Sequence, residues 1–300
     1  MKIAYLILCH KDPQHIHRLS KRLSAYADVF IHVDAHSDIT PFLNELSEQN
    51  NIHFLSDRIR VNWGSFDSIR ATVLLLDAAL SHGKYDRFVL LQGADYPLKT
   101  DSEIQTYFTE HSDKEFIRGC RLSDSNDPYF RRKQYGYWFY RKRNLLTRVY
   151  NNILVCAFNK MPRLKITHGY ITENGSHFDL YWGCAQFSAT GVFARYLSDF
   201  YHSHPLFNKY MEHAFPCDEI YVPTVFFNSP YAAQGIYSPE QPRKNPEYFR
   251  NLHYFEYPSQ IRIWKYTDYN NLMQRPELFI RKVTTQESSS LLDLLDQNNQ

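Results

Sequence analysis

Apolar and polar residues alternate along the first 120 residues in blocks that predict buried strands separated by helices. Continuous apolar runs at residues 3–9, 29–33, 52–55 and 87–92 are typical of strands buried on both faces, and residues 115–118 predict a fifth strand. Residues 14–26 and 67–80 place apolar side chains at helical spacing. This alternation predicts an α/β fold whose mostly parallel central sheet is flanked by helices on both faces.

The pattern changes in the second half of the chain. Residues 121–172 lose regular periodicity and are rich in basic and aromatic side chains, which predicts an irregular insertion. Regular structure is expected to resume near residue 181, with one helix at 192–201 and another after Cys217. Residues 285–300 are predicted to be a weakly held tail. Because no repeat or linker composition is visible, the sequence predicts a single domain over residues 1–300.

Composition narrows the class of protein. No apolar run approaches the roughly 20 residues that cross a bilayer, and the apolar N-terminus is followed by Lys-Asp-Pro rather than by a signal-peptide cleavage site. The 5 cysteines are scattered, which argues against a disulfide framework or structural zinc and favours a reducing cytoplasm. A net charge of +2 gives no global case for binding nucleic acid. The 23 Tyr and 21 Phe favour carbohydrate only weakly, since aromatic rings also fill cores.

Candidate chemistry lies where the predicted strands end, because ligands of parallel sheets bind at the carboxyl edge. Gly-x-Gly-x-x-Gly, P-loop and Gly-x-Ser-x-Gly motifs are all missing from the sequence, which argues against dinucleotide oxidoreductases, NTPases and serine hydrolases of those types. His32, Asp34 and His36 suit a metal site if the strand continues, whereas a turn after residue 33 would leave Asp34 to contact a nucleotide or to stabilise the turn.

Four further positions have two interpretations each. The Trp63-Gly64-Ser65 turn either caps a helix through Ser65 or lies against a nucleotide. Asp95 follows a buried strand and either caps the next segment or contacts substrate. Trp182 either stacks on a sugar from a loop or packs in the core.

The fourth position is the acidic pair Asp218-Glu219. It either complements a helix dipole or supplies a general base, with Glu219 the better placed of the two. A faint Asp-x-Asp-like pattern at residues 124–127 is interpreted as a polar turn.

Seven segments occur together in the order of one known family. They are A-Y-L-I-L-C-H at 4–10, H-V-D at 32–34, V-N-W-G-S at 61–65, L-Q-G-A-D-Y-P-L-K-T at 91–100, Y-W-G-C at 181–184, C-D-E at 217–219 and L-F-I-R-K at 278–282. The chain resembles the core-2/I-branching β-1,6-N-acetylglucosaminyltransferases and the peptide-O-xylosyltransferases, glycosyltransferase family 14. The resemblance covers residues 3–283 and implies a GT-A-like, Rossmann-type fold, a UDP-sugar donor, inversion at the anomeric carbon, and neither metal nor cofactor.

The resemblance also assigns roles to residues. Glu219 matches the catalytic base of a Pro-Asp-Glu segment, with one residue inserted, and Lys282 matches a lysine that binds the donor diphosphate. His253 stands where the family has a second diphosphate-binding arginine, so Arg250 or Arg262 is expected to substitute. The remaining expected donor contacts are His10, Asp34, Trp63 and Gly64, and the expected acceptor contacts are Asp95, Trp182 and Asp218. Pro223 is expected to kink the helix after Glu219.

On this basis residues 1–120 form the nucleotide-sugar-binding half and residues 173–284 the acceptor and catalytic half. We expect a cytoplasmic bacterial enzyme of surface-polysaccharide synthesis, with N-acetylglucosamine or xylose as the foremost donor sugars and a glycan or lipid-linked oligosaccharide as acceptor. The basic-aromatic region at residues 129–165 is expected either to rest weakly on an anionic membrane surface or to be a solvated loop. Two competing hypotheses are a metal-dependent GT-A transferase of another family and a non-enzymatic module that binds nucleic acid through that region.

Overall fold

A five-stranded, mainly parallel sheet forms the centre of the molecule in the computed structural model, which describes residues 1–44, 50–127, 130, 133–134, 145–160, 167–238, 247 and 250–299. Its strand order is β10-β4-β1-β2-β3, and only β10 runs antiparallel to its neighbour. The strands are β1 (Ile3–Cys9), β2 (Asp28–Val33), β3 (Ile52–Phe54), β4 (Arg87–Gln92) and β10 (Ser188–Thr190). The predicted α/β fold with a mostly parallel sheet is therefore confirmed.

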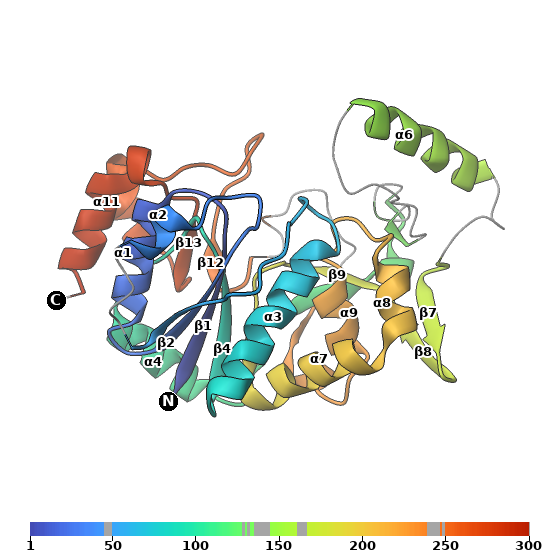
Figure 1. Cartoon of the computed structure of the whole chain (residues 1–300), viewed down its shortest axis with the longest axis horizontal. Helices are drawn as coiled ribbons and strands as arrows, with labels where there is room; N and C mark the ends of the chain where they lie inside the picture. Colours follow the sequence, from blue (N-terminus) through green and yellow to red (C-terminus); the bar gives the residue numbers. More distant parts are fainter. Residues whose placement is uncertain are drawn as a thin grey trace.

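Helices cover both faces of this sheet. Side chains of β1 alternate between two cores, with Ala4 and Leu6 in one and Tyr5 and Ile7 in the other. The first core lies under α3 (Asp67–His82), α7 (Gly191–Ser203) and α9 (Tyr221–Phe227), and the second under α1 (Pro13–Leu23), α4 (Asp101–Glu110) and α11 (Thr285–Gln297). Figure 1 shows α3 and α7 on one side of the strands and α1 and α11 on the other.

Three smaller sheets extend the structure. One has the order β11-β6-β9, a second β12-β13-β5, and the third is the hairpin of β7 and β8. Their strands are β5 (Asp95–Pro97), β6 (Arg118–Arg121), β7 (Tyr170–Glu173), β8 (Ser176–Asp179), β9 (Tyr181–Gly183), β11 (Ile236–Tyr237), β12 (His253–Tyr254) and β13 (Phe279–Arg281). The other elements are α2 (Thr40–Leu43), η1 (Leu122–Asp124), α6 (Leu145–Lys160), α8 (Pro205–Met211), η3 (Ala232–Gln234), η5 (Tyr266–Asp268) and α10 (Tyr269–Met273).

The fifth predicted strand begins three residues later than expected. Residues 115–118 were expected to form it, whereas β6 starts at Arg118. The carboxylate of Glu115 instead accepts a hydrogen bond from the Thr190 backbone N–H at 2.8 Å, just before α7. Phe116 forms only an isolated bridge with Ser188. The Phe116 N–H donates to the Ser188 carbonyl at 2.9 Å, so the chain contacts β10 at one residue before β6 begins.

The prediction of an irregular insertion at residues 121–172 is wrong for two of its parts, since α6 and the start of β7 lie within it. In Figure 1, α6 lies at the upper right, apart from the other labelled helices. Much of the basic-aromatic region, including residues 131–132 and 135–144, lies outside the described residues. The polar turn expected at residues 124–127 is confirmed, because Ser125 Oγ accepts a hydrogen bond from the Asp127 N–H at 3.2 Å.

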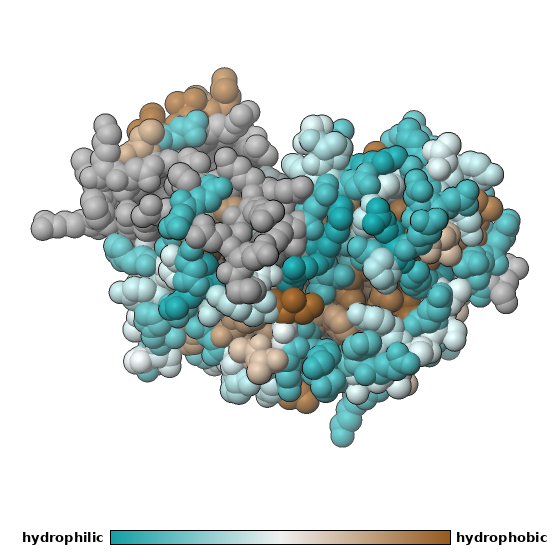
Figure 2. Space-filling model, turned by 180° about the vertical axis from the view of Figure 1, so that it is seen from behind, coloured by the Kyte–Doolittle hydropathy of each residue, from teal (hydrophilic) through white to brown (hydrophobic). Residues whose placement is uncertain are grey.

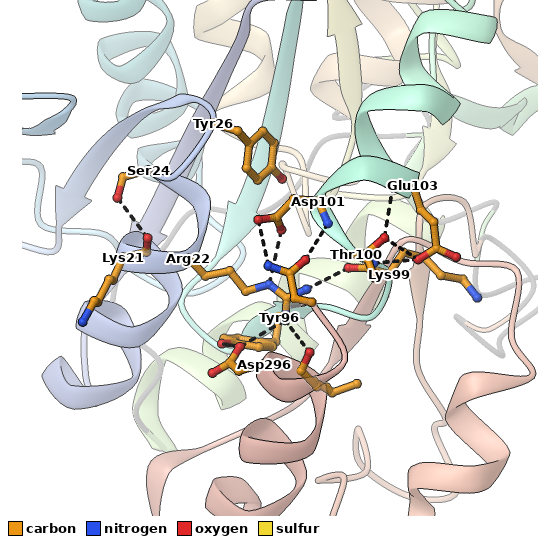
Figure 3. A network of polar contacts seen from close by, with 12 residues as sticks. Lys21, Arg22, Ser24, Tyr26, Tyr96, Lys99, Thr100, Asp101, Glu103 and Asp296 are labelled. Atoms are coloured by element: carbon orange, nitrogen blue, oxygen red, sulfur yellow. Dashed lines mark hydrogen bonds and ion pairs between the residues drawn. The ribbon is translucent and has the colours of Figure 1, made fainter.

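The prediction of a weakly held tail is also wrong. Residues 285–297 form α11, and the guanidinium of Arg22 on α1 donates to the Leu295 carbonyl oxygen at 3.1 Å and to Asp296 Oδ1 at 3.1 Å. The hydroxyl of Tyr96 donates to the same carboxylate oxygen at 2.6 Å. Figure 3 shows the Arg22 side chain between Asp296 and the segment that contains Lys99 and Asp101. The sequence pattern did not show them because Arg22 and Asp296 are 274 residues apart.

Apolar packing fixes the same helix, and this leads to a stability prediction. Leu291 is fully buried in the second core, whereas Leu294 on the same helix is only half-buried. Large-to-small substitution at a buried leucine removes packing and leaves a cavity. We expect Leu291→Ala to lower the free energy of unfolding by about 2–5 kcal/mol and Leu294→Ala to cost clearly less, as measured by urea denaturation. Equal, small losses for both variants would show that α11 is not part of the core.

Candidate active site

The carboxyl ends of β1 and β2 meet at one edge of the central sheet and bring charged side chains together. Burial lowers the pKa of His10, and the positive charges of Lys11, Lys282 and Arg281 lower it further, while the charge of Asp34 raises it. All of these groups must therefore lie close enough to act on the His10 ring. The structure thus brings together three of the predicted donor contacts, His10, Asp34 and Lys282, which come from distant parts of the sequence.

Asp34 organises the turn that follows β2. Its Oδ1 accepts hydrogen bonds from the His36 backbone N–H at 2.7 Å and lies 2.9 Å from His36 Nδ1. The strand ends at Val33, so His32 points elsewhere and its Nε2 accepts from the Ile59 N–H at 2.8 Å. Within the part of the chain that the structure describes, no group of three His, Cys, Asp or Glu side chains is arranged to hold a metal ion.

Asp95 is buried in an ionic network rather than exposed towards an acceptor. Its side chain is fully buried, with Oδ1 2.7 Å from the Arg281 guanidinium and Oδ2 accepting from the Gln92 N–H at 2.7 Å. Nε2 of His253 lies 3.3 Å from Oδ2. Burial alone would raise the pKa of Asp95, but the charges of Arg281 and His253 hold it at about 2. Both oxygens are therefore occupied, and the expected acceptor contact is replaced by the positioning of Arg281.

Lys282 and Arg281 are neighbouring cations at the end of β13. The backbone of Lys282 is fixed on both sides, since its N–H donates to the Arg262 carbonyl at 3.1 Å and its carbonyl accepts from the Trp264 N–H at 2.9 Å. Burial lowers the pKa of the Lys282 ammonium, and the charges of Arg281 and Lys11 lower it further. Three positive charges therefore crowd one location, an arrangement that favours binding of an anion.

Arg250 and Arg262, the expected substitutes for a second donor-binding arginine, both have carboxylate partners. Arg262 is held by Glu256 at 2.8 Å and by Asp268 at 2.6 Å, and Arg250 pairs with Glu247 at 2.9 Å. Both arginines lie against the aromatic rings near residue 254, beside a cavity of about 270 Å³ that Arg262 lines.

Neighbouring side chains of a strand point to opposite faces, which separates this cavity from the network of Asp95. In β12, Tyr254 lines the cavity. The next residue back, His253, stacks on Phe279, its partner residue in β13. The side chains of Phe279 and Arg281 lie on the same face of β13. The side chains of Arg250 and Arg262 are therefore paired with carboxylates beside this cavity, although the Arg262 backbone carbonyl accepts the Lys282 N–H. Sequence reasoning missed Arg281, although it directly precedes Lys282 in the matched L-F-I-R-K segment.

Glu219 lies in the turn before α9, half-buried and held by Trp182. The indole Nε1 donates to Glu219 Oε2 at 2.8 Å. Burial raises the pKa of Glu219 to about 7; the charge of Lys133 and the indole hydrogen bond oppose this rise, and the charge of Asp218 adds to it. A carboxyl group with a pKa near neutrality is suited to accept a proton in catalysis.

Trp182 lies in strand β9, not in the expected loop, and only 4% of its surface is exposed. Its ring packs edge-to-face on Phe130 with centroids 4.7 Å apart. The alternative of core packing therefore fits better than stacking on a sugar. Sequence reasoning had no signal for the indole contact with Glu219, since the two residues lie 37 positions apart on different elements.

Asp218 lies beside Glu219, and its Oδ1 is buried without a hydrogen-bond partner among the described residues. Burial raises the pKa of Asp218, while its contacts with the backbone N–H groups of Asp218 and Glu219 and the charges of Lys133 and Arg281 oppose that rise. The expected kink at Pro223 is absent, because α9 begins at Tyr221 and the proline falls in the first turn, where no helical donor is lost.

Trp63 and Gly64 pack against the segment that leads to Glu219. The Gly64 carbonyl accepts a hydrogen bond from the Cys217 N–H at 2.9 Å. Gly64 has φ +73°, and a Cβ there would lie 2.3 Å from the ring of Phe215, so only glycine fits. Trp63 is 68% exposed and meets Phe215 edge-to-face. Ser65 lies one residue before the observed N-cap of α3, Phe66, although its hydroxyl accepts from the Asp67 N–H at 3.2 Å.

Arg281 connects the cationic group to the acidic pair. Its charge lowers the pKa of Lys282 and of Asp218. Burial raises the pKa of the Cys184 thiol to about 12. The charges of Glu219 and Asp95 also raise this pKa, and the charge of Arg281 lowers it. Cys184 follows directly after β9, so Arg281 at the end of β13 and Glu219 before α9 both lie close enough to this end of β9 to act on the thiol.

Comparison with known proteins identifies the family of the chain. The family model described as Core-2/I-Branching enzyme matches residues 3–240. A xylosyltransferase from Ciona intestinalis is 26% identical over 140 residues, which are 45% of this chain and 16% of that protein. The chain therefore spans about a sixth of the length of this curated relative.

Solved structures resemble the chain only distantly. S. aureus TarS is 13% identical with a TM-score of 0.29, over 40% of this chain and 21% of that one. A putative glucose-1-phosphate thymidylyltransferase from Bacillus anthracis is 12% identical with a TM-score of 0.37, over 79% of this chain and 86% of that one. The family model, by contrast, covers residues 3–240, which include His10, Asp34 and the acidic pair but not Arg281 and Lys282. The chain belongs to the Core-2/I-Branching enzyme family.

Proposed function

We propose that this protein is a glycosyltransferase that moves a sugar from a UDP-sugar to a hydroxyl group of a glycan, with inversion and without a metal ion. The observation that carries the proposal is Glu219, whose pKa is raised by burial to about 7 and whose Oε2 is held by Trp182. The cation Arg281 acts on the pKa of Asp218, the neighbour of Glu219, and precedes Lys282 directly in the chain. Family membership supports the reaction class, and the xylosyltransferase relative supports a sugar as the transferred group.

The donor diphosphate would bind at Lys282 and Arg281. When the bond between the anomeric carbon and the diphosphate oxygen breaks, negative charge grows on the departing UDP. Fixed cations that already point at this charge stabilise the transition state without reorganisation. Arg281 is held in place by Asp95, which keeps its own negative charge because its pKa is about 2. We assign Arg281, rather than Arg250 or Arg262, as the second cation.

The acceptor would be activated by Glu219. Trp182 occupies Oε2, which leaves Oε1 to take the proton of the acceptor hydroxyl. The acceptor oxygen forms the new bond to the anomeric carbon on the face opposite the leaving group, and UDP departs with the electron pair of the broken bond. Asp218 assists through its charge, since it raises the pKa of Glu219 and makes the carboxylate a stronger base.

For the donor sugar, the acceptor and the cellular role, we propose what the family suggests. N-acetylglucosamine or xylose is the foremost donor sugar, and a glycan or lipid-linked oligosaccharide of bacterial surface polysaccharide is the proposed acceptor. The exposed ring of Trp63, next to the segment before Glu219, supports a carbohydrate ligand there, because aromatic rings stack on sugars.

A thermal-shift screen tests the function directly, combined with an assay of UDP release. We expect UDP and at least one UDP-sugar to raise the melting temperature, with or without EDTA. A ligand at 100 times its Kd stabilises by about 2.7 kcal/mol. ADP and a single-stranded oligonucleotide serve as controls and should give no comparable rise. A rise that requires Mn²⁺ would favour a metal-dependent transferase, and a rise with the oligonucleotide alone would favour a nucleic-acid-binding module.

A further inference from the structure

An apolar helix face is exposed to solvent on α6. Leu145 is 75% exposed, Leu146 80% and Ile153 62%, and Val149 and Tyr150 are more than half exposed. Leu145, Val149 and Ile153 are four residues apart, as are Leu146 and Tyr150, so the five side chains form two adjacent rows on one face of the helix. Figure 2 shows apolar atoms at this outer end of the molecule, at the upper left.

This surface is unlike the isolated apolar residues that are common on protein surfaces, because its members are contiguous. No helix in the described part of the chain has both the length and the apolar character needed to cross a membrane, and α6 has 16 residues. A helix of this length with one apolar face is suited to lie in the plane of a lipid surface, with that face in the acyl boundary.

The charge of the sequence around α6 identifies the partner. Residues 128–165 contain ten basic residues and no Asp or Glu, although the whole chain carries only +2. The basic residues are Arg131, Arg132, Lys133, Arg141, Lys142, Arg143, Arg148, Lys160, Arg163 and Lys165. In the sequence, the basic triplet at 141–143 ends two residues before Leu145, the first residue of the apolar face.

An anionic lipid surface satisfies both features, whereas each of two alternatives satisfies only one. A second copy of the chain would cover the apolar face but would bring two strongly basic segments together. A nucleic acid would match the charge but would leave the leucines in water. An anionic lipid surface attracts the basic residues and buries the apolar ones.

We propose that α6 docks this protein on an anionic lipid bilayer by inserting Leu145, Leu146, Val149, Tyr150 and Ile153 into the interface. This inference rests on the proposed function in one respect: docking would hold the enzyme near a lipid-linked acceptor. Docking itself requires neither donor nor catalysis. A binding assay without substrate therefore separates failure of this inference from failure of the proposed activity.

The test is co-sedimentation of the full-length protein with vesicles of phosphatidylcholine alone or with 30% phosphatidylglycerol. We expect binding to the anionic vesicles that weakens as salt rises and at least a tenfold loss of affinity in the double variant Leu146→Glu, Ile153→Glu. The matched control is Val192→Glu on α7, because Val192 is 61% exposed, comparable to Ile153, but lies outside the basic region. This control should bind like the wild type.

Several results would overturn the inference. They are equal binding by the double variant and the wild type, no binding by the wild type, and binding that high salt leaves unchanged. A wild-type dimer in lipid-free solution that the double variant converts to a monomer would assign the face to a second copy instead. Circular dichroism and the thermal shift with UDP verify that each variant is folded, and they report on the donor site independently of lipid.

Discussion

Replacing Glu219 by glutamine is expected to lower kcat for sugar transfer by about 10²–10⁴-fold, the usual contribution of a general base. Glutamine has nearly the same shape and keeps an oxygen to accept the hydrogen bond that Trp182 Nε1 donates to the carboxylate. Only the ability to take a proton is lost. Affinity for UDP, measured by calorimetry, should therefore change little. A loss of UDP binding that matches the loss of activity would contradict the assignment of Glu219 as the base.

The pH dependence of the wild type gives a second measurement of the same group. Because the base must be ionised, activity should rise with pH through a midpoint near 7, the pKa to which burial raises Glu219. A carboxyl whose pKa is raised on folding destabilises the fold once the pH passes above its unfolded value. Glu219→Gln should therefore melt at a higher temperature than the wild type at pH 8 while remaining inactive. A lower melting temperature would show that Glu219 serves the fold instead.

Replacing Lys282 by methionine is expected to lower kcat by about 10²–10³-fold, as when one stabilising group for transition-state charge is removed. Methionine retains the length and apolar stem of lysine but not its charge. The loss should appear in both kcat and UDP affinity, because the diphosphate is charged before and after transfer. Radiolabelled sugar transfer and calorimetry measure the two effects.

Two further variants, one at a control lysine and one at Arg262, are compared with Lys282→Met. Lys265→Met removes an exposed lysine that pairs with Glu287 at 2.9 Å, and it should leave activity unchanged. Arg262→Met tests the expectation from sequence that Arg262 binds the diphosphate. We expect little effect on UDP affinity, since Arg262 is already paired with Glu256 and Asp268. A loss as large as that of Lys282→Met would restore the original assignment and contradict ours.

The central sheet could be predicted from sequence because each of its parallel strands is signalled locally. Ile3–Cys9 and Arg87–Gln92 are apolar runs bounded by polar residues, and both have the predicted limits. The short strands of the smaller sheets have no such signal. β12 has only two residues and pairs with a segment 26 positions away, so its existence depends on tertiary contacts.

Side-chain partners explain the remaining differences. Asp95 was singled out from the sequence and Arg281 was missed, because their pairing requires knowledge that β5 and β13 are neighbours. The contact of Trp182 with Glu219 requires β9 to lie beside the start of α9. Helix α11 is held by a hydrogen bond from Arg22 and by its buried leucines, which pack against strands that are distant in the sequence. In each case a long-range contact overrode a local pattern.

A crystal structure of the protein with UDP, grown in the presence of EDTA, tests the central claim most directly. We predict that the diphosphate contacts the Lys282 ammonium and the Arg281 guanidinium, with the Glu219 carboxylate facing the open position beyond the terminal phosphate. UDP bound instead in the cavity beside Arg262, or at a site from which Glu219 points away, would contradict the account.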